Sequence, residues 1–384
     1  MRSDDQGDDD MAEVQGTCEA RFEGVRKALS ASLDSGGDVG ASVAVYLHGE
    51  PVVDIWGGYV DEAKSAPWER DTLTNVWSTT KTMTFVCALI LADRKQLDFH
   101  APVATYWPEF AAGGKGAVEV RHLMGHTAGL SGWEKPITGE QLADWELCTS
   151  ALAAQVPWWE PGSASGYHAL TQGYLIGEVV RRITGESIGA WFAQEVAKPL
   201  GADFFIGLPE SEDRRVSNVI PPPPIDVEGL EVTEILMKTF TNPPLDAAMA
   251  HQAWWRRAEI PAANGQGNAR SVAAIQSVIA GKGQSAGVRL LSESGTDPIF
   301  ETQADGTDLV LGLPTHFGMG YGLSSETMPI GPRACYWGGY GGSLIVIDQD
   351  KDVAVSYVMN RMESGVVGDE RGATILQETM TALG

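Results

Sequence analysis

The sequence predicts an α/β protein of the α+β type, in which both ends of the chain contribute strands to one antiparallel sheet. Three observations lead to this expectation. Strand-like runs lie near the two ends, helix patterns fill the long stretch between them, and a helix pattern accompanies each terminal group of strands. Segments that are far apart in sequence can share one sheet and one hydrophobic core, so we expect the two terminal groups to meet.

The N-terminal group begins with an amphipathic helix and continues with a hairpin. Residues 22–37 carry apolar side chains at helical spacing and end in two glycines, Gly36 and Gly37, which can close a helix. Residues 41–60 form two β-rich runs around Gly49 and Glu50. Short β-rich runs separated by a tight turn predict a hairpin.

The C-terminal group consists of further strand candidates followed by a closing helix. The sequence DQDK, at 348–351, is typical of a turn between two of the strands, and residues 372–383 have a helix pattern. The four strand candidates are residues 318–326, 333–342, 343–348 and 353–360.

These elements divide the chain into two expected domains and a tail. Residues 16–94 and 306–384 would form the α/β domain, residues 95–305 a mostly helical domain, and the active site would lie at their junction. Residues 1–15 are acidic and have no apolar run, which predicts a disordered tail. The four consecutive prolines Pro221 to Pro224 predict a loop within the helical domain, because proline donates no backbone hydrogen bond.

Composition excludes several classes of partner. The 384-residue chain has a formal net charge of −24, which would repel nucleic acid and anionic membrane surfaces. No segment has the length of a membrane span, and the acidic start is unlike a signal peptide. The four cysteines lie far apart, a pattern typical of reduced thiols, so a cytoplasmic location is expected.

We expect no cofactor and no metal ion. His122 and His126 are four residues apart, but no neighbouring acidic residue completes a zinc-site motif. Gly318, Gly320 and Gly322 lie on a strand candidate without the following helix that a dinucleotide-binding loop needs.

Two serines compete as the nucleophile of a hydrolase, and the first is Ser187 in GESIG, residues 185–189. This stretch fits Gly-x-Ser-x-Gly, a motif in which a strand must lead into the serine and a helix must leave it. Here helix patterns stand on both sides. We therefore interpret Gly185 as the end of one helix and Ser187 as the cap of the next.

The second candidate is Ser78 in WSTTK, directly before a helix pattern that is apolar all round. Lys81 follows three residues later, and helical spacing would place its amine beside the Ser78 hydroxyl. A buried lysine with a depressed pKa next to a serine is a nucleophile with its base. The same pattern also fits a capping serine and a lysine whose amine reaches solvent.

Two further motifs support the catalytic interpretation through a resemblance to a known family. WSTTK, then GYHALTQGYLIGEVVRRITG and finally YWGGYGGS occur in the order and spacing of the serine β-lactamase and penicillin-binding-protein superfamily. Within it, the chain most resembles the family VIII carboxylesterases. The stretches RHLMGHTAGL and HFGMGYGL are similar to this superfamily as well, and the likeness covers about residues 20 to 380.

The resemblance implies a β-lactamase-like fold and a role for each motif residue. Ser78 would be the nucleophile, Lys81 its base partner and Tyr167 the tyrosine of the second motif. The backbone amides of Ser78 and Tyr340 would form the oxyanion hole, with Tyr340 following Trp337, Gly338 and Gly339. His168 could contact the leaving group or make a neighbouring hydrogen bond instead.

Two departures from the lactamase motifs favour an esterase. Tyr-x-Asn is replaced by Tyr167-His168-Ala169, and Trp337 occupies the position of the lysine that begins the third motif. The resemblance thus implies hydrolysis of small-molecule carboxylic esters through an acyl-serine, with transfer to an amine or alcohol acceptor as the alternative. A weak β-lactamase or peptidase, or a covalent sensor that barely turns over, also stays open.

Overall fold

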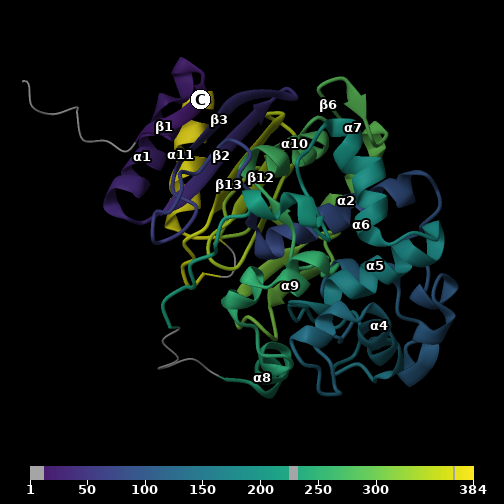
Figure 1. The fold of residues 1–384 in the computed structure, drawn as a ribbon. Coiled ribbons are helices and arrows are strands. Elements are labelled where there is room, and N and C mark those ends of the chain that lie inside the picture. The colour runs from purple at the N-terminus through teal and green to yellow at the C-terminus, as the bar shows by residue number, and fades with distance from the viewer. Residues whose placement is uncertain (1–12, 225–231, 366–367) are drawn as a thin grey trace, which may run out of the picture.

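The computed structural model describes residues 13–224, 232–365 and 368–384, and a nine-stranded antiparallel sheet runs through it (Figure 1). The N-terminal strands β1 to β3 occupy one side of the sheet, and the C-terminal strands β8 to β13 occupy the other. The two groups meet where β2 pairs with β13, from Ala41 opposite Met359 to Leu47 opposite Val353. The strand order is β1-β3-β2-β13-β12-β11-β10-β9-β8. The predicted sharing of one sheet by both chain ends is confirmed.

The predicted hairpin and the last three predicted strands are present. The hairpin consists of β2 (Gly40–Leu47) and β3 (Glu50–Gly58), and His48 and Gly49 turn between them with positive φ values of 53° and 77°. Positive φ at both turn positions is typical of a two-residue hairpin loop. The other strands are β1 (Val14–Cys18), β8 (Ala304–Thr307), β9 (Pro314–Phe317), β10 (Gly322–Leu323), β11 (Ala334–Gly338), β12 (Leu344–Asp348) and β13 (Val353–Met359).

Helices cover both faces of the central strands, which explains their sequence. All residues of β12 and β13 are buried. Strands covered on both faces are apolar throughout, whereas strands covered on one face alternate. The helices α1 (Glu23–Ser35) and α11 (Glu370–Leu383) pack together on one side of the sheet, and α10 (Ala269–Ala280) packs on β2, β12 and β13 (Figure 1). Gly36 ends α1 in the left-handed conformation, as predicted.

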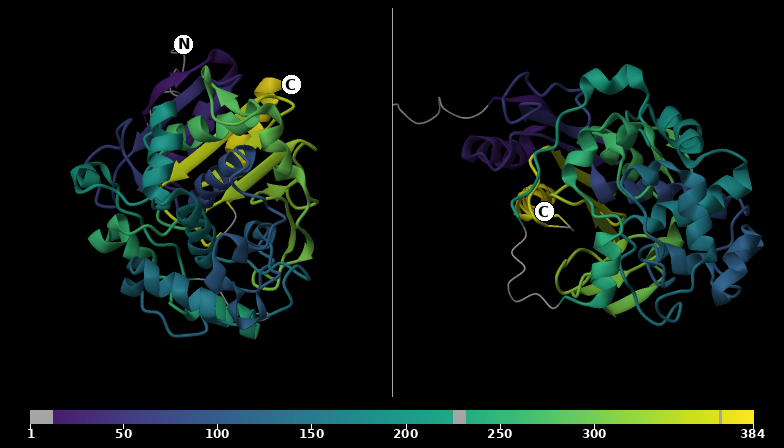
Figure 2. Two further views of the ribbon diagram at one scale, coloured as in Figure 1. Left: turned by 90° about the vertical axis from the view of Figure 1, so that its right-hand side faces the viewer. Right: turned by 60° about the horizontal axis from the view of Figure 1, so that its bottom comes forward.

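The middle of the chain is mostly helical and surrounds α2 (Lys81–Asp93), which packs on α5 and α6. Figures 1 and 2 show α2 between the sheet and these helices. All residues from Lys81 to Leu91 are buried, in agreement with a helix that is apolar all round. The remaining α-helices are α3 (Val120–Met124), α4 (Trp145–Ala154), α5 (Thr171–Thr184), α6 (Ile188–Phe192), α7 (Lys198–Leu200), α8 (Glu234–Thr241) and α9 (Ala253–Arg257). Two short antiparallel strand pairs lie outside the large sheet: β4 (Thr74–Asn75) with β5 (Gln266–Gly267), and β6 (Gln284–Ser285) with β7 (Val288–Arg289).

The structure differs from the expected boundaries in four places. Strand β1 begins at Val14, inside the segment expected as a disordered tail, because its backbone pairs with β3; residues 1–12 of that segment lie outside the described residues. Helix α10 packs on the sheet although it belongs to the expected helical segment, and α2 packs on helices although it belongs to the expected α/β segment. Of residues 318–326, Gly322 and Leu323 alone are in a strand.

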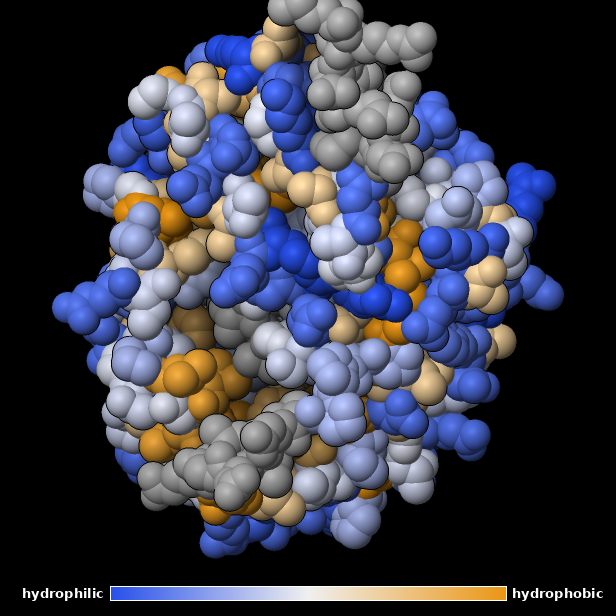
Figure 3. Space-filling model, turned by 90° about the vertical axis from the view of Figure 1, so that its left-hand side faces the viewer, coloured by the Kyte–Doolittle hydropathy of each residue, from blue (hydrophilic) through white to orange (hydrophobic). Residues whose placement is uncertain are grey.

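The face drawn in Figure 3 is largely hydrophilic, in keeping with the charge. Figure 3 shows apolar patches interrupting a hydrophilic face, and part of the apolar surface borders a hollow near the middle of that face. Scattered apolar surface is normal for a globular protein. Within the described ranges no helix is both long enough and apolar enough to cross a membrane.

Candidate active site

Ser78 lies in a 3-10 turn, Trp77–Thr80, that leads directly into α2. The turn begins with strain, because Trp77 has a φ of 49°, a conformation that non-glycine residues adopt rarely and only when their surroundings hold them. The Trp77 ring packs against the rings of Trp255 and Tyr340, each with a centroid distance of 5.7 Å. This packing fixes the turn, and Ser78, its second residue, is 9% exposed.

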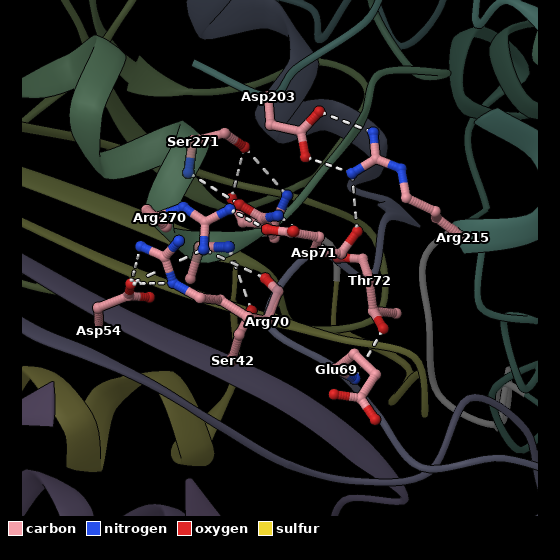
Figure 4. Close-up of polar contacts among 12 residues, drawn as sticks. Ser42, Asp54, Glu69, Arg70, Asp71, Thr72, Asp203, Arg215, Arg270 and Ser271 are labelled. Atoms are coloured by element: carbon pink, nitrogen blue, oxygen red, sulfur yellow. Dashed lines mark hydrogen bonds and ion pairs between the residues drawn. The ribbon is translucent and has the colours of Figure 1, made fainter. Parts of the chain in front are cut away.

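An ion-pair network fixes the chain segment that leads to this turn (Figure 4). Arg70 binds Asp54 on β3 at 2.9 Å, and Arg270 in the first turn of α10 binds Asp71 at 2.7 Å. Arg215 donates to the Asp71 carbonyl at 3.0 Å. Three separate parts of the chain therefore meet at residues 70–71. Arg270 therefore helps to hold the chain segment that leads to the Ser78 turn.

Lys81 lies one helical turn after Ser78 and is completely buried. Its Nζ is 3.2 Å from Ser78 Oγ and donates to the carbonyls of Ala169 at 2.7 Å and Ala262 at 3.0 Å. Burial lowers the pKa of the Lys81 amine well below its usual range. A neutral amine has two N–H donors and one lone pair. The two carbonyls accept both donors, so the lone pair of the neutral amine is available for the Ser78 hydroxyl.

Tyr167 approaches Ser78 from the segment before α5. Its hydroxyl lies 2.7 Å from Ser78 Oγ, and burial raises the pKa of the phenol, so the hydroxyl keeps its proton. The Lys81 Nζ lies 4.8 Å from the centre of the Tyr167 ring. Among the described residues no hydrogen bond joins the amine to the tyrosine hydroxyl. Lys81 and Tyr167 therefore both contact Ser78 Oγ and do not contact each other through a hydrogen bond.

The residues after β11 pack against the turn that carries Ser78. A Cβ atom added to Gly339 would lie 3.3 Å from Ser78 N and only 2.4 Å from Val76 O, so a glycine is required at this contact. The Ser343 hydroxyl donates to Val76 O at 2.9 Å and is 2.9 Å from Thr79 Oγ1, which ties the end of the strand to the serine turn. Gly339, Tyr340 and Ser343 therefore lie beside the turn that carries Ser78.

Trp337 is 4% exposed and is part of an aromatic cluster. Its ring stacks on His126 with a centroid distance of 5.5 Å and an interplanar angle of 11°, and meets Phe85 edge-on at 5.6 Å. The ring centroid of Tyr167 lies 6.2 Å away. Trp337 thus supplies aromatic surface beside Tyr167 at the position where the lactamase motif would supply a cation.

Of the two roles considered for His168, the structure favours the neighbouring hydrogen bond, because both of its ring nitrogens are engaged by the backbone. Nε2 accepts from the Leu130 N–H at 3.1 Å, and Nδ1 donates to Gly166 O at 2.6 Å. Burial lowers the pKa of His168 to about 3, so the ring is neutral. His168 therefore holds the loop that carries Tyr167.

Two residues whose role the sequence interpretation missed position Tyr167. Asp308 is fully buried, and its Oδ1 accepts from the backbone amides of Tyr167 at 3.0 Å, Val310 at 2.9 Å and Leu311 at 2.9 Å. The ring of His126 packs on that of Tyr167 at 5.0 Å. A lone aspartate 141 positions away from its partner carries no motif, so no pattern in the sequence points to it.

Ser187 has the structural role that its context predicts. It is the N-cap of α6, where its Oγ accepts from the Ala190 N–H at 3.3 Å and donates to Glu259 at 2.6 Å. Gly185 ends α5 with a left-handed φ of 78°. Neither Lys81 nor Tyr167 is among its partners.

An apolar pocket opens next to Tyr167. Trp337, Tyr336 and Phe317 line it on the strand side, and Leu311, Leu313 and Met328 line it from the loops. All its lining residues are uncharged. In the described parts of the chain, no group of three or more His, Cys, Asp or Glu side chains is arranged to hold a metal ion.

The chain belongs to the beta-lactamase family, whose model matches residues 25–379. It is 36% identical over 377 residues to the esterase/beta-lactamase LipL of Mycobacterium tuberculosis, a match that covers 94% of this chain and 86% of LipL. The family resemblance inferred from the three motifs is confirmed.

Two solved structures have the same fold over nearly the whole chain. A family VIII carboxylesterase is 39% identical with a TM-score of 0.92, covering 96% of this chain and all of the other. A penicillin-binding-protein homologue from Caulobacter crescentus is 34% identical with a TM-score of 0.91, again covering 96% of this chain and all of the other. The predicted α/β class with a β-lactamase-like architecture is therefore confirmed.

Proposed function

We propose that the protein is a serine hydrolase that cleaves carboxylic esters of small molecules through an acyl-Ser78 intermediate. The observation that carries this proposal is the position of Ser78 Oγ, 3.2 Å from the buried Lys81 amine and 2.7 Å from the Tyr167 hydroxyl. The similarity to a family VIII carboxylesterase and to an esterase/beta-lactamase supports the choice of an ester as the substrate.

The proposed reaction uses the two neighbours of Ser78 for different proton transfers. Neutral Lys81 takes the Ser78 proton as the hydroxyl attacks the ester carbonyl, and the amides of Ser78 and Tyr340 stabilise the negative oxygen. The C–O bond to the alcohol then breaks, and Tyr167 gives its proton to the departing oxygen. The proton that Lys81 took from Ser78 then passes to the Tyr167 oxygen, a step that requires the two side chains to move into hydrogen-bond contact after Ser78 is acylated. Water attacks the acyl-serine by the reverse route and regenerates the enzyme.

Product analysis tests this proposal directly. The protein is mixed with a short-chain p-nitrophenyl ester, and intact mass spectrometry follows the protein while the acid and the phenol are quantified. A transient acyl adduct on Ser78 and one equivalent of acid per phenol are expected. An adduct that never disappears would show a covalent sensor instead, and transfer of the acyl group to an added amine or alcohol in place of acid would show an acyltransferase.

The charge state of Lys81 predicts the pH dependence of kcat/KM. A protonated amine has no lone pair, so activity is low below the depressed pKa of Lys81 and rises as the pH passes through it. No loss is expected as the pH approaches about 10, because burial raises the pKa of Tyr167 above the usual tyrosine value. The measurement is kcat/KM for an uncharged ester between about pH 5 and about pH 10. An activity that falls with rising pH in this range would contradict a neutral-lysine base.

Because Trp337 offers no positive charge for a carboxylate, we expect the enzyme to react poorly with β-lactams, which carry one. We expect a neutral ester to exceed a cephalosporin in kcat/KM by about tenfold to a hundredfold, since a missing charge-assisted hydrogen bond costs about 1.5–3 kcal/mol. Trp337→Lys should narrow the gap. The matched control is Trp337→Met, which removes the same ring without adding a charge. A wild-type preference for the cephalosporin, or equal effects of both variants, would contradict this role of charge.

A further inference from the structure

The apolar pocket opens beside Tyr167, whose hydroxyl contacts Ser78 Oγ. Tyr167, Trp337 and Gly338 line it, whereas Ser78, Trp77 and Tyr340 do not. Because the Tyr167 hydroxyl lies 2.7 Å from Ser78 Oγ, a substrate group that extends from Ser78 into the pocket passes Tyr167.

We infer that this pocket holds the alcohol portion of the ester and that the preferred substrates are esters of uncharged, apolar alcohols. The inference rests on the proposed function, in which Tyr167 protonates the departing alcohol oxygen. A proton transfer requires that this oxygen lie within hydrogen-bond reach of the Tyr167 hydroxyl. The remainder of the alcohol then extends along the Tyr167 ring into the pocket that this ring lines, and the acyl group extends away from it.

The chemistry of the walls selects the class of alcohol. Trp337, Tyr336 and Phe317 offer aromatic surface, and Leu311, Leu313 and Met328 add aliphatic surface. Aryl and larger alkyl groups gain from leaving water for such a pocket, in proportion to the apolar area that they bury. A charged alcohol would lose its hydration there without finding an opposite charge among the lining residues.

Leu313 is the position at which the size of the pocket can be changed with the least risk to the fold. Its side chain lines the pocket, yet the residue is 53% exposed in the connection between β8 and β9. Leu313→Trp should narrow the pocket, and Leu313→Ala should widen it. The matched control is Val156→Trp, a second exposed apolar residue, 65% exposed, which is not among the lining residues.

The test uses two series of esters on the same four proteins. In the alcohol series the acyl group is always acetyl, and the alcohol changes from methyl to phenyl to 1-naphthyl. In the acyl series the alcohol is always methyl, and the acyl group changes from acetyl to butanoyl to benzoyl. Esters with one acyl group share the same acyl-enzyme, so the alcohol affects acylation alone, measured as kcat/KM, and leaves the rate of acetyl-enzyme hydrolysis unchanged.

We expect Leu313→Trp to lower kcat/KM at least about tenfold for 1-naphthyl acetate and less than about twofold for methyl acetate, with Leu313→Ala having the opposite trend. The acyl series and the acetyl-enzyme hydrolysis rate should not respond, and Val156→Trp should behave as wild type. A response confined to the acyl series would show that the pocket holds the acyl group. No response in either series would show that the pocket is not part of the substrate site. Either result overturns the inference. Failure of the proposed function would appear separately, as wild-type protein that forms no acetyl adduct on Ser78.

Discussion

Replacing Ser78 with alanine is expected to abolish both ester turnover and acyl-enzyme formation. The nucleophile and its base act as one unit in serine hydrolases, so loss of the hydroxyl should lower kcat on the order of 10⁶-fold. Ser187→Ala should leave kcat within a few-fold, because Ser187 caps α6 and donates to Glu259 without touching Lys81 or Tyr167. The measurements are steady-state turnover of a p-nitrophenyl ester and intact mass after a rapid quench.

Thermal unfolding provides the control for this comparison. Loss of the Ser187 cap should cost about 0.5–2 kcal/mol of stability, so this variant should unfold at a lower temperature and still be active. Ser78→Ala should be inactive while folded. An active Ser78→Ala protein together with an inactive, folded Ser187→Ala protein would move the nucleophile to GESIG and refute the assignment of the site.

Changes to the two neighbours of Ser78 should give the second largest effects, and these effects should not multiply. Lys81→Met and Tyr167→Phe are each expected to lower kcat/KM by about 10²–10⁴-fold, the usual contribution of a positioned acid or base. Both groups contact Ser78 Oγ, at 3.2 and 2.7 Å, and their proton transfers depend on each other, because the proton that Lys81 takes from Ser78 restores the Tyr167 hydroxyl. The double variant should therefore lose little more than the worse single variant.

The choice of methionine keeps the interpretation of this experiment simple. Methionine fills most of the space of the lysine side chain, so the buried helix α2 keeps its packing. The carbonyls of Ala169 and Ala262 lose their donor, and unfolding of the variant must be measured alongside its kinetics. Losses that multiply fully would show that the two residues act independently, which would contradict a common function at Ser78.

The sequence determined those parts of the molecule whose cause is local. Apolar spacing and the terminal glycines predicted α1, β2 and β3 with their turn, β12, β13 and α11, because hydrophobic period and turn residues act within a few positions. The helix pattern on both sides of GESIG showed that Ser187 caps a helix. Ser78 and Lys81 could be paired for the same reason, since three residues of helix bring their side chains together.

Contacts between distant segments were decided by the tertiary structure alone. The pairing of Tyr167 with Ser78 was known through the family resemblance, but its anchor Asp308, the ring of His126 and the tie from Ser343 to Val76 join residues more than forty positions apart. The sheet also recruited β1 from the acidic start and α10 from the helical middle of the chain. Buried carboxylates and unpaired strand edges must find partners wherever the fold brings them, and no periodic pattern in the sequence records which partner that is.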